Sequence, residues 1–360
     1  MKNEFYDSNK TYEENYTDGP FGLFRKLPEQ EYPKGQYSLF GIPIDIPFGI
    51  PAGPLLNSNF VRGAWAWGFS LATYKTVRGT EYPCHPFPNV IRLKSSGNVR
   101  PGDTLVGDLN IDSIDVMHDG ITNSFGVPSR PVEVWQKDVR ETLQEMTPGN
   151  LLLLSFMGTK SDTMTSSQYI DDFARTAKLA KETGAPVLEV NFSCPNVGKE
   201  GLICNDVETS STILEAMKPV RGNVPLLVKV GYIPADQQSM LEALLDAIHD
   251  HASGVVSINT IQAKVTNDGG QQILPGSPVR LYSGVCGGAI RWAGLEMAER
   301  IMAYKKRKGW KDFVVIGVGG VVSPDDYFAY MKLGVDAVQS ATGAMWKPDL
   351  AIDIRRSGIL

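Results

Sequence analysis

Residues 151–192 read LLLLSFMGTKSDTMTSSQYIDDFARTAKLAKETGAPVLEVNF and contain one repeating unit of the fold. The stretch begins with an apolar run, 151–156, and ends with another, 186–192. Short runs rich in Val, Ile and Leu are typical of strands that are covered on both faces. Between the two runs, apolar residues recur at helical spacings of 3, 4 and 3: Ile170, Phe173, Ala177 and Ala180. The stretch therefore predicts a strand, a helix and a second, parallel strand.

The same alternation continues outward along the chain. Six further apolar runs are predicted to be strands: 48–53, 69–76, 225–230, 254–259, 313–318 and 335–341. Helical stripes cover 240–248 and 290–302, and Ser323-Pro324 begins another helix that Gly334 ends. Eight strands that alternate with helices predict an α/β fold. The number eight favours a closed (β/α)8 TIM barrel over an open doubly wound sheet.

Two connections are too long to be simple turns. Residues 77–130 follow the second predicted strand, and residues 260–288 follow the sixth. Long ordered loops in compact domains usually act as lids or subunit contacts. We therefore expect a barrel domain, residues 39–360, with long insertions after strands 2 and 6. A polar N-terminal arm, residues 1–38, is expected to wrap over its surface.

The composition excludes several classes of protein. Among 360 residues, 35 Lys and Arg stand against 40 Asp and Glu, and the resulting net charge of −5 argues against a nucleic-acid partner. No apolar run is long enough for a transmembrane segment, and the first residues lack the apolar core of a signal peptide. The four cysteines are scattered, so we expect neither a disulfide framework nor a metal site. These features predict a cytoplasmic globular protein.

Polar residues collect at one end of the predicted barrel. Lys75, Asn191, Lys229 and Asn259 lie at or near the C-terminal ends of four predicted strands. This is the face where (β/α)8 enzymes place their catalytic groups. Two lysines inside apolar strands need a counter-charge or an anionic ligand. An internal salt bridge is the structural explanation for them, and an anionic ligand is the functional one.

The segment EVNFSCPNVG, residues 189–198, is the most specific local signal. An apolar strand ends in Asn191 and is followed by a Ser-Cys-Pro turn and Asn196. Amide side chains offer paired donors and acceptors, which suit a flat heterocycle. The thiolate of Cys194 would be both a nucleophile and a base. Free cysteine is also often a small buried core residue, so the spacing alone leaves the role of Cys194 open.

Two glycine-rich loops follow late strands: SGVCGGAI at 283–290 and GVGGVVSP at 317–324. The segment SATGAM after the last strand adds Thr342. Backbone N–H groups in such loops can approach a phosphate, and barrels often bind phosphate after their last two strands. Tight turns explain a single loop of this kind about as well. A dinucleotide-binding fold is disfavoured, because no GxGxxG opens a βαβ unit.

Taken in order, these motifs resemble those of the dihydroorotate dehydrogenase family, whose members are FMN-binding (β/α)8 barrels. The resemblance extends from about Leu39 to Trp346 and rests on the joint order of PFGIPAG, YKT, NSFGVPS, NFSCPN, VKV, SINT, SGVCGGAI, IGVGG and SATGA. It implies an FMN cofactor and the oxidation of dihydroorotate to orotate in pyrimidine biosynthesis. Cys194 would be the base that removes the C5 proton, while hydride passes from C6 to the flavin N5.

The resemblance also assigns roles to individual residues. Cys194 and Lys75 would be the catalytic residues, with Lys75 beside both flavin and substrate. The substrate would be bound by Lys75, Asn123, Phe125, Gly126, Val127, Asn191, Asn196, Asn259 and Thr260. The FMN would be bound by Ala52, Gly53, Lys75, Thr76, Asn191, Lys229, Gly287, Gly288, Gly319, Gly320, Ala341 and Thr342.

A cysteine base is similar to that of the soluble class 1 enzymes of this family, and we expect a homodimer. The segments NVGKEGLICND and SGVCGGAI are similar to the forms that pair with an iron–sulfur flavin subunit. They are also similar to the pyrimidine-reducing domain of dihydropyrimidine dehydrogenase. Two alternatives therefore stay open: the same flavin chemistry on uracil or thymine, and a non-catalytic flavin- or pyrimidine-binding scaffold. The sequence does not fix the electron acceptor.

Overall fold

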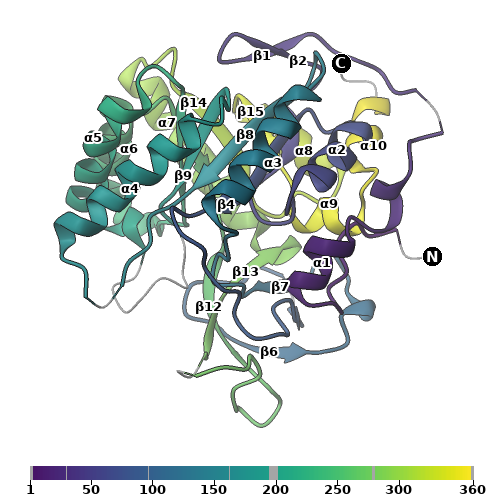
Figure 1. Cartoon of the computed structure of the whole chain (residues 1–360). Coiled ribbons are helices and arrows are strands. Elements are labelled where there is room, and N and C mark those ends of the chain that lie inside the picture. Colours follow the sequence, from purple (N-terminus) through teal and green to yellow (C-terminus); the bar gives the residue numbers. More distant parts are fainter. Residues whose placement is uncertain are drawn as a thin grey trace.

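The computed structural model describes residues 3–29, 31–95, 97–161, 163–193, 202–277 and 280–357. Eight parallel strands close into a barrel in the order β3-β4-β8-β9-β10-β11-β14-β15 (Figure 1). Their bounds are β3 (Phe48–Ile50), β4 (Leu71–Val77), β8 (Leu151–Phe156), β9 (Val187–Asn191), β10 (Leu226–Val230), β11 (Gly254–Ser257), β14 (Val314–Val318) and β15 (Ala337–Gln339). The predicted TIM barrel and its eight strands are confirmed. Several strands are shorter than predicted, because residues such as Asn259 already belong to the loops that follow.

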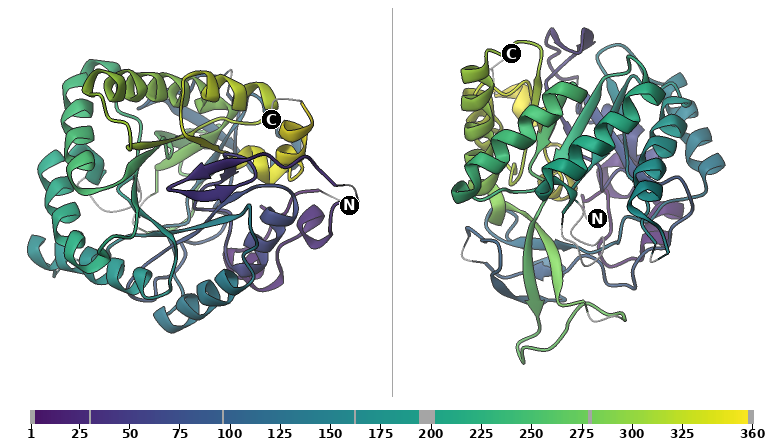
Figure 2. Two further views of the ribbon diagram at one scale, coloured as in Figure 1. Left: turned by 90° about the horizontal axis from the view of Figure 1, so that it is seen from above. Right: turned by 90° about the vertical axis from the view of Figure 1, so that its left-hand side faces the viewer.

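Helices surround the barrel (Figure 2). They are α2 (Ser58–Ala66), α3 (Val132–Gln144), α4 (Ser166–Lys181), α5 (Val207–Arg221), α6 (Gln238–His251), α7 (Arg291–Lys308), α8 (Pro324–Lys332), α9 (Thr342–Trp346) and α10 (Leu350–Arg356). The signals for α8 are confirmed: Ser323 and Asp326 form a reciprocal cap, and Gly334 follows the helix with a φ of +87°. In the described ranges, none of the helices combines the length and apolar character that crossing a membrane requires.

The inside of the barrel is divided into an apolar layer and a polar layer. The apolar layer includes Leu71, Leu151, Leu153, Val187, Leu227, Val256, Val314, Ile316 and Ala337. The antiparallel hairpin of β1 (Tyr37–Leu39) and β2 (Ile42–Ile44) covers the N-terminal end of the barrel, and its apolar side chains join the same cluster. Polar interior side chains, among them Asn191 and Lys229, lie nearer the C-terminal ends of the strands. In the described part of the chain, the polar end is therefore the end at which a ligand can enter.

The two long insertions are confirmed, and they fold together into a second sheet. This sheet closes in the order β12-β13-β7-β5-β6 and lies next to the barrel (Figure 1). Its strands are β5 (Arg92–Leu93), β6 (Thr104–Asp108), β7 (Gly120–Asn123), β12 (Ile261–Thr266) and β13 (Tyr282–Gly287). β7 and β13 pair antiparallel, with Asn123 opposite Gly284. The sequence did not predict this sheet, because its strands are short and irregular loops separate them.

The N-terminal arm is packed more deeply than a surface wrap. It contains α1 (Tyr12–Asp18) and the 3-10 helix η1 (Gly22–Arg25). Phe5 is fully buried, and its ring stacks on that of Phe24 with centroids 4.2 Å apart. The same ring meets the edge of Phe60 in α2. Aromatic side chains thus anchor a segment whose overall composition is polar.

We expect Phe5→Ala to lower the free energy of unfolding by about 3–5 kcal/mol, the usual cost of removing a buried phenylalanine ring. Denaturant unfolding of the purified variant measures this loss. Phe87→Ala is the matched control, because Phe87 is 42% exposed and its truncation should change stability little. Equal stability of the Phe5 variant and the unsubstituted protein would show that the arm is not part of the core.

Candidate active site

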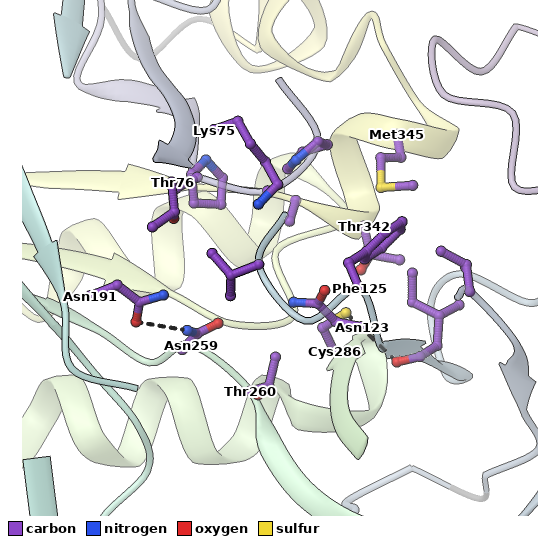
Figure 3. A pocket seen from close by; sticks show the side chains of 18 of the residues that line it. Lys75, Thr76, Asn123, Phe125, Asn191, Asn259, Thr260, Cys286, Thr342 and Met345 are labelled. Carbon is purple, nitrogen blue, oxygen red and sulfur yellow. Dashed lines mark hydrogen bonds between the residues drawn. The ribbon is translucent and has the colours of Figure 1, made fainter. Parts of the chain in front are cut away.

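A cavity lies at the C-terminal ends of the barrel strands, where the barrel, the second sheet and the N-terminal arm meet (Figure 3). It contains about 1010 Å³ of empty space, including its mouth. Its wall combines apolar side chains with a few polar and charged groups, which is the usual lining of a ligand pocket. The predicted site residues that line the cavity are Ala52, Gly53, Lys75, Thr76, Asn123, Phe125, Gly126, Val127, Asn191, Lys229, Asn259, Thr260, Ala341 and Thr342.

A smaller cavity of about 290 Å³ adjoins the first one, with which it shares part of its wall. Its predicted residues are Gly287, Gly319, Gly320, Ala341 and Thr342. The three glycines have φ angles of +101°, +128° and +69°, a region that favours glycine. Gly288 is placed differently: it begins η5 (Gly288–Ile290), and a Cβ there would lie 2.1 Å from the carbonyl oxygen of Met117. A close approach of two backbones explains that glycine.

Two predicted site residues, Cys194 and Asn196, lie outside the described residues, and their roles stay predictions. The residue before them in the chain is described. Ser193 lines the cavity, and its carbonyl oxygen accepts a hydrogen bond of 2.5 Å from Asn259 Nδ2. Ser193, which precedes Cys194 in the sequence, thus belongs to the cavity wall.

Two amide side chains contact each other across the C-terminal end of β10: Asn191 ends β9, and Asn259 follows β11 (Figure 3). Asn259 Nδ2 lies 3.5 Å from Asn191 Oδ1, and Asn191 Oδ1 also accepts from the Ser193 N–H at 2.9 Å. These contacts fix which atom of each amide is engaged. They leave Asn191 Nδ2 as a donor and Asn259 Oδ1 as an acceptor for a ligand. A flat heterocycle with carbonyl and ring N–H groups can use both.

Two buried lysines supply the positive charge of the cavity. Lys75 on β4 is 8% exposed and Lys229 on β10 is 4% exposed. Burial lowers the pKa of Lys229 because the ammonium group loses its hydration, while the negative charge of Glu189 on β9 opposes that shift. In the sequence, Glu189 stands out only as part of the EVNFSCPNVG motif. Lys229 thus has a counter-charge in the barrel, and the cavity in front of both lysines can also receive an anion.

Several hydroxyl groups of the cavity wall are buried without a partner. Thr260 Oγ1 and Thr342 Oγ1 have no hydrogen-bond partner among the described residues. A buried polar group left unpaired costs about 1–3 kcal/mol, so such groups are normally satisfied by a ligand or water. At Gly53, with a φ of +146°, a Cβ would point into open space. These groups fit a polar ligand with a flat surface and an anionic tail.

The structure adds site residues that sequence reasoning missed. Tyr6 and Tyr12 of the N-terminal arm line the cavity, and both rings meet the edge of Phe125 at centroid distances of 6.1 and 6.3 Å. Cys286 and Met345 complete this part of the wall. The arm has no hydrophobic periodicity, so no signal in the sequence connected its tyrosines with the barrel. Together these side chains give the cavity one aromatic and apolar side.

Comparisons with known proteins agree on one family. A family model described as Dihydroorotate dehydrogenase matches residues 111–356. The protein named dihydroorotate dehydrogenase of Dictyostelium discoideum is 35% identical to this chain, over 96% of this chain and 95% of that protein. The NAD-dependent dihydropyrimidine dehydrogenase subunit PreA of Escherichia coli (strain K12) is 28% identical, over 63% of this chain and 52% of that protein.

A solved structure agrees with the fold. It is the crystal structure of DHODH in complex with ferulenol from Eimeria tenella, which matches with a TM-score of 0.69 over 92% of this chain and 85% of that chain. The sequence identity is 16%, so this likeness concerns the architecture alone. It supports the arrangement of barrel and flanking helices described above.

The described cysteines should react slowly with alkylating agents at neutral pH. Burial raises the pKa of Cys84, Cys204 and Cys286 to about 11, because the thiolate is the form that burial disfavours. In a Cys194→Ser variant at pH 7.5, we expect native alkylation to be at least about a hundredfold slower than after denaturation, where thiols titrate near 8.5. The native rate should rise about tenfold per pH unit. Rapid native labelling of this variant at pH 7.5 would contradict the burial of these thiols.

Proposed function

The chain belongs to the dihydroorotate dehydrogenase family, and from this premise we propose that it catalyses the FMN-dependent oxidation of dihydroorotate to orotate in pyrimidine biosynthesis. The observation that carries the proposal is the cavity itself. It combines two buried lysines, a fixed pair of amides and a glycine-lined extension. A planar anionic substrate and a phosphate-bearing cofactor need these groups.

FMN fits the chemistry of the larger cavity and its extension. Ala52, Gly53 and Lys229 would hold the ring system, because they give it a flat wall and a positive charge. The phosphate would be held by Gly287, Gly319, Gly320, Ala341 and Thr342, which line the extension. When bound, FMN supplies the acceptor for the hydride of dihydroorotate C6. A positive charge beside the ring stabilises the electron-rich form of a flavin.

The substrate carboxylate would be met by Lys75 and the turn at 125–127. Arg78 fixes this turn, since its guanidinium donates to the carbonyl oxygens of Gly126 at 3.2 Å and Val127 at 2.9 Å. Within the described part of the chain, the N–H groups of the turn have no hydrogen bond to a backbone carbonyl. They are therefore available to an anion, and charge-assisted hydrogen bonds are stronger than neutral ones.

Cys194 would remove the proton from dihydroorotate C5. The thiolate accepts the proton, the C5–H electrons form the C5=C6 double bond, and the C6 hydride leaves with its electron pair. The support for this role is the place of Ser193, which Asn259 holds at the cavity wall immediately before Cys194. Asn196 would contribute a further amide to the pyrimidine.

The proposal also covers the quaternary structure. We expect a cytoplasmic homodimer, with an iron–sulfur flavin subunit as the alternative partner. The similarity to the PreA subunit favours a second candidate activity, the same chemistry on an uncharged dihydropyrimidine. That substrate has no carboxylate, so it would leave the N–H groups of the turn at 125–127 without an anion to bind. Affinity for a carboxylate therefore separates the two activities.

We expect anaerobic mixing with dihydroorotate to bleach the visible absorbance of the FMN-loaded protein, and dihydrouracil to bleach it far more slowly. Orotate should bind about a hundredfold or more tightly than uracil. Two or three buried donors left unpaired cost roughly 1–3 kcal/mol each, and about 1.4 kcal/mol corresponds to tenfold. Titration of each pyrimidine against the flavin spectrum measures the ratio. Equal affinities, or bleaching by dihydrouracil alone, would favour the second activity, and orotate binding without turnover would indicate a scaffold.

Cys194→Ser should retain FMN but slow flavin reduction by dihydroorotate by about a hundredfold or more. A serine hydroxyl has nearly the same size but is a far weaker base near neutral pH, and general-base catalysis commonly contributes 10²–10⁴-fold. The unsubstituted protein should react faster as pH rises and the thiol ionises. Stopped-flow absorbance measures both rates. Cys84→Ser is the control, because Cys84 is half-buried outside the substrate-binding wall. Unchanged kinetics in the Cys194 variant would remove this residue from the mechanism.

A further inference from the structure

Glu189 is a charged side chain in the barrel interior to which the mechanism assigns no role. On β9, Val187 belongs to the apolar interior layer and Asn191 lines the cavity. Side chains alternate along a strand, so Glu189 faces the interior between these two. On β10, Leu227 pairs with Glu189 and Lys229 pairs with Asn191. Glu189 therefore lies one layer below Lys229, at the floor of the cavity.

The carboxylate of Glu189 has an unusual environment. The residue is fully buried, and neither of its oxygens has a hydrogen-bond partner among the described residues. Burial raises the pKa of Glu189, and the positive charge of Lys229 opposes that shift. A buried charge pair contributes little to stability compared with apolar packing. A purely structural role would be served equally well by an apolar residue at this position.

Few other titratable groups lie around Glu189 and Lys229. Among the described residues, the other titratable groups that line the same cavity are Lys75 on β4, Cys286 on β13, and Tyr6 and Tyr12 of the N-terminal arm. Burial raises the pKa of both tyrosines, so they are uncharged near neutral pH. Burial raises the pKa of the Cys286 thiol to about 11, so it is uncharged near neutral pH. On the neighbouring strand β8, the residue that pairs with Glu189 is the neutral Ser155. The Glu189 charge thus acts mainly on Lys229.

We propose that Glu189 is a positioning residue that keeps Lys229 protonated while the cofactor is oxidised, and thereby favours reduction of the cofactor. This inference rests on the FMN-binding part of the proposed function. A flavin gains electron density on reduction, and a charged group near the ring decides how strongly the reduced form is bound. A lysine that is already protonated stabilises the reduced flavin without taking up a proton. A neutral amine would first have to take one from solvent.

Glu189→Gln tests this inference, because it removes the charge and preserves the shape. Burial then acts on Lys229 unopposed, so the amine is neutral over more of the pH range. We expect the preference of the site for reduced over oxidised FMN to fall about tenfold or more at pH 8, because the neutral amine no longer stabilises the electron-rich form. The preference should also become more strongly pH-dependent, because reduction now draws a proton to Lys229. Redox titration of the FMN-loaded protein from pH 6 to 9 measures both effects and needs no substrate.

Two further variants separate charge from packing. Thr73→Val replaces a buried neutral side chain of the barrel interior without changing charge, and it should leave the potential and its pH dependence as they are. The double variant Glu189→Gln, Lys229→Met removes both charges and avoids a lone buried lysine, so it remains testable if the single variant does not fold. It should show the lower preference for reduced FMN with no added pH dependence. An unchanged potential and pH dependence in Glu189→Gln, or an unchanged potential in the double variant, would overturn the inference.

Failure of the inference about Glu189 can be distinguished from failure of the proposed function. Protein that binds FMN but is not reduced by dihydroorotate would disprove the proposed substrate, while the redox titration would still decide the role of Glu189. Absence of FMN binding by the unsubstituted protein would overturn both. A normal reaction with dihydroorotate, together with an unchanged potential in Glu189→Gln, would overturn the role of Glu189 alone.

Discussion

The burial of the Lys229 ammonium group is the constraint on which the rest of the site depends. An isolated charge inside a protein costs several kcal/mol unless opposite charge or hydrogen bonds compensate it. In this barrel the compensation comes from two sides: Glu189 lies below Lys229, and the cavity above it is open to an anionic or electron-rich ligand. The apolar layer beneath makes that arrangement necessary, because water cannot reach the lysine from the other end of the barrel. The site is therefore built to be completed by a ligand.

Three parts of the chain close the space in which that ligand lies. The barrel supplies the floor with its lysines and amides, and the second sheet supplies Asn123 and Cys286 at the side. The N-terminal arm adds Tyr6 and Tyr12, whose rings rest against Phe125. Excluding water lowers the effective dielectric constant, so each charge in the cavity acts more strongly than it would in solvent. The deep packing of Phe5 in the arm thus bears on the electrostatics of the site as well as on stability.

The sequence predicted the parts of this structure in which apolar residues recur at regular spacings. The alternation of apolar runs and helical stripes identified the eight barrel strands, and polar residues at strand ends identified Lys75, Asn191, Lys229 and Asn259 as neighbours. Parts of the structure without a periodic sequence pattern were not predicted. The strands of the second sheet are short, and the tyrosines of the arm reach the cavity through tertiary packing that no local pattern encodes. The phosphate role of Gly288 stays a prediction, and the close backbone of Met117 is a second reason for a glycine at this position.

The distance of one layer between Glu189 and Lys229 matters for what the lysine can do. A direct salt bridge would use the donors of Lys229 and turn them away from the cavity. Both oxygens of Glu189 lack a hydrogen-bond partner among the described residues, so the carboxylate compensates the lysine through space instead. Coulomb interactions fall off slowly with distance in a medium of low dielectric constant, whereas a hydrogen bond requires contact. The ammonium can therefore keep its charge and still direct its N–H groups to a ligand. The parallel register of β9 and β10, which sets Lys229 level with Asn191 and above Glu189, produces this separation.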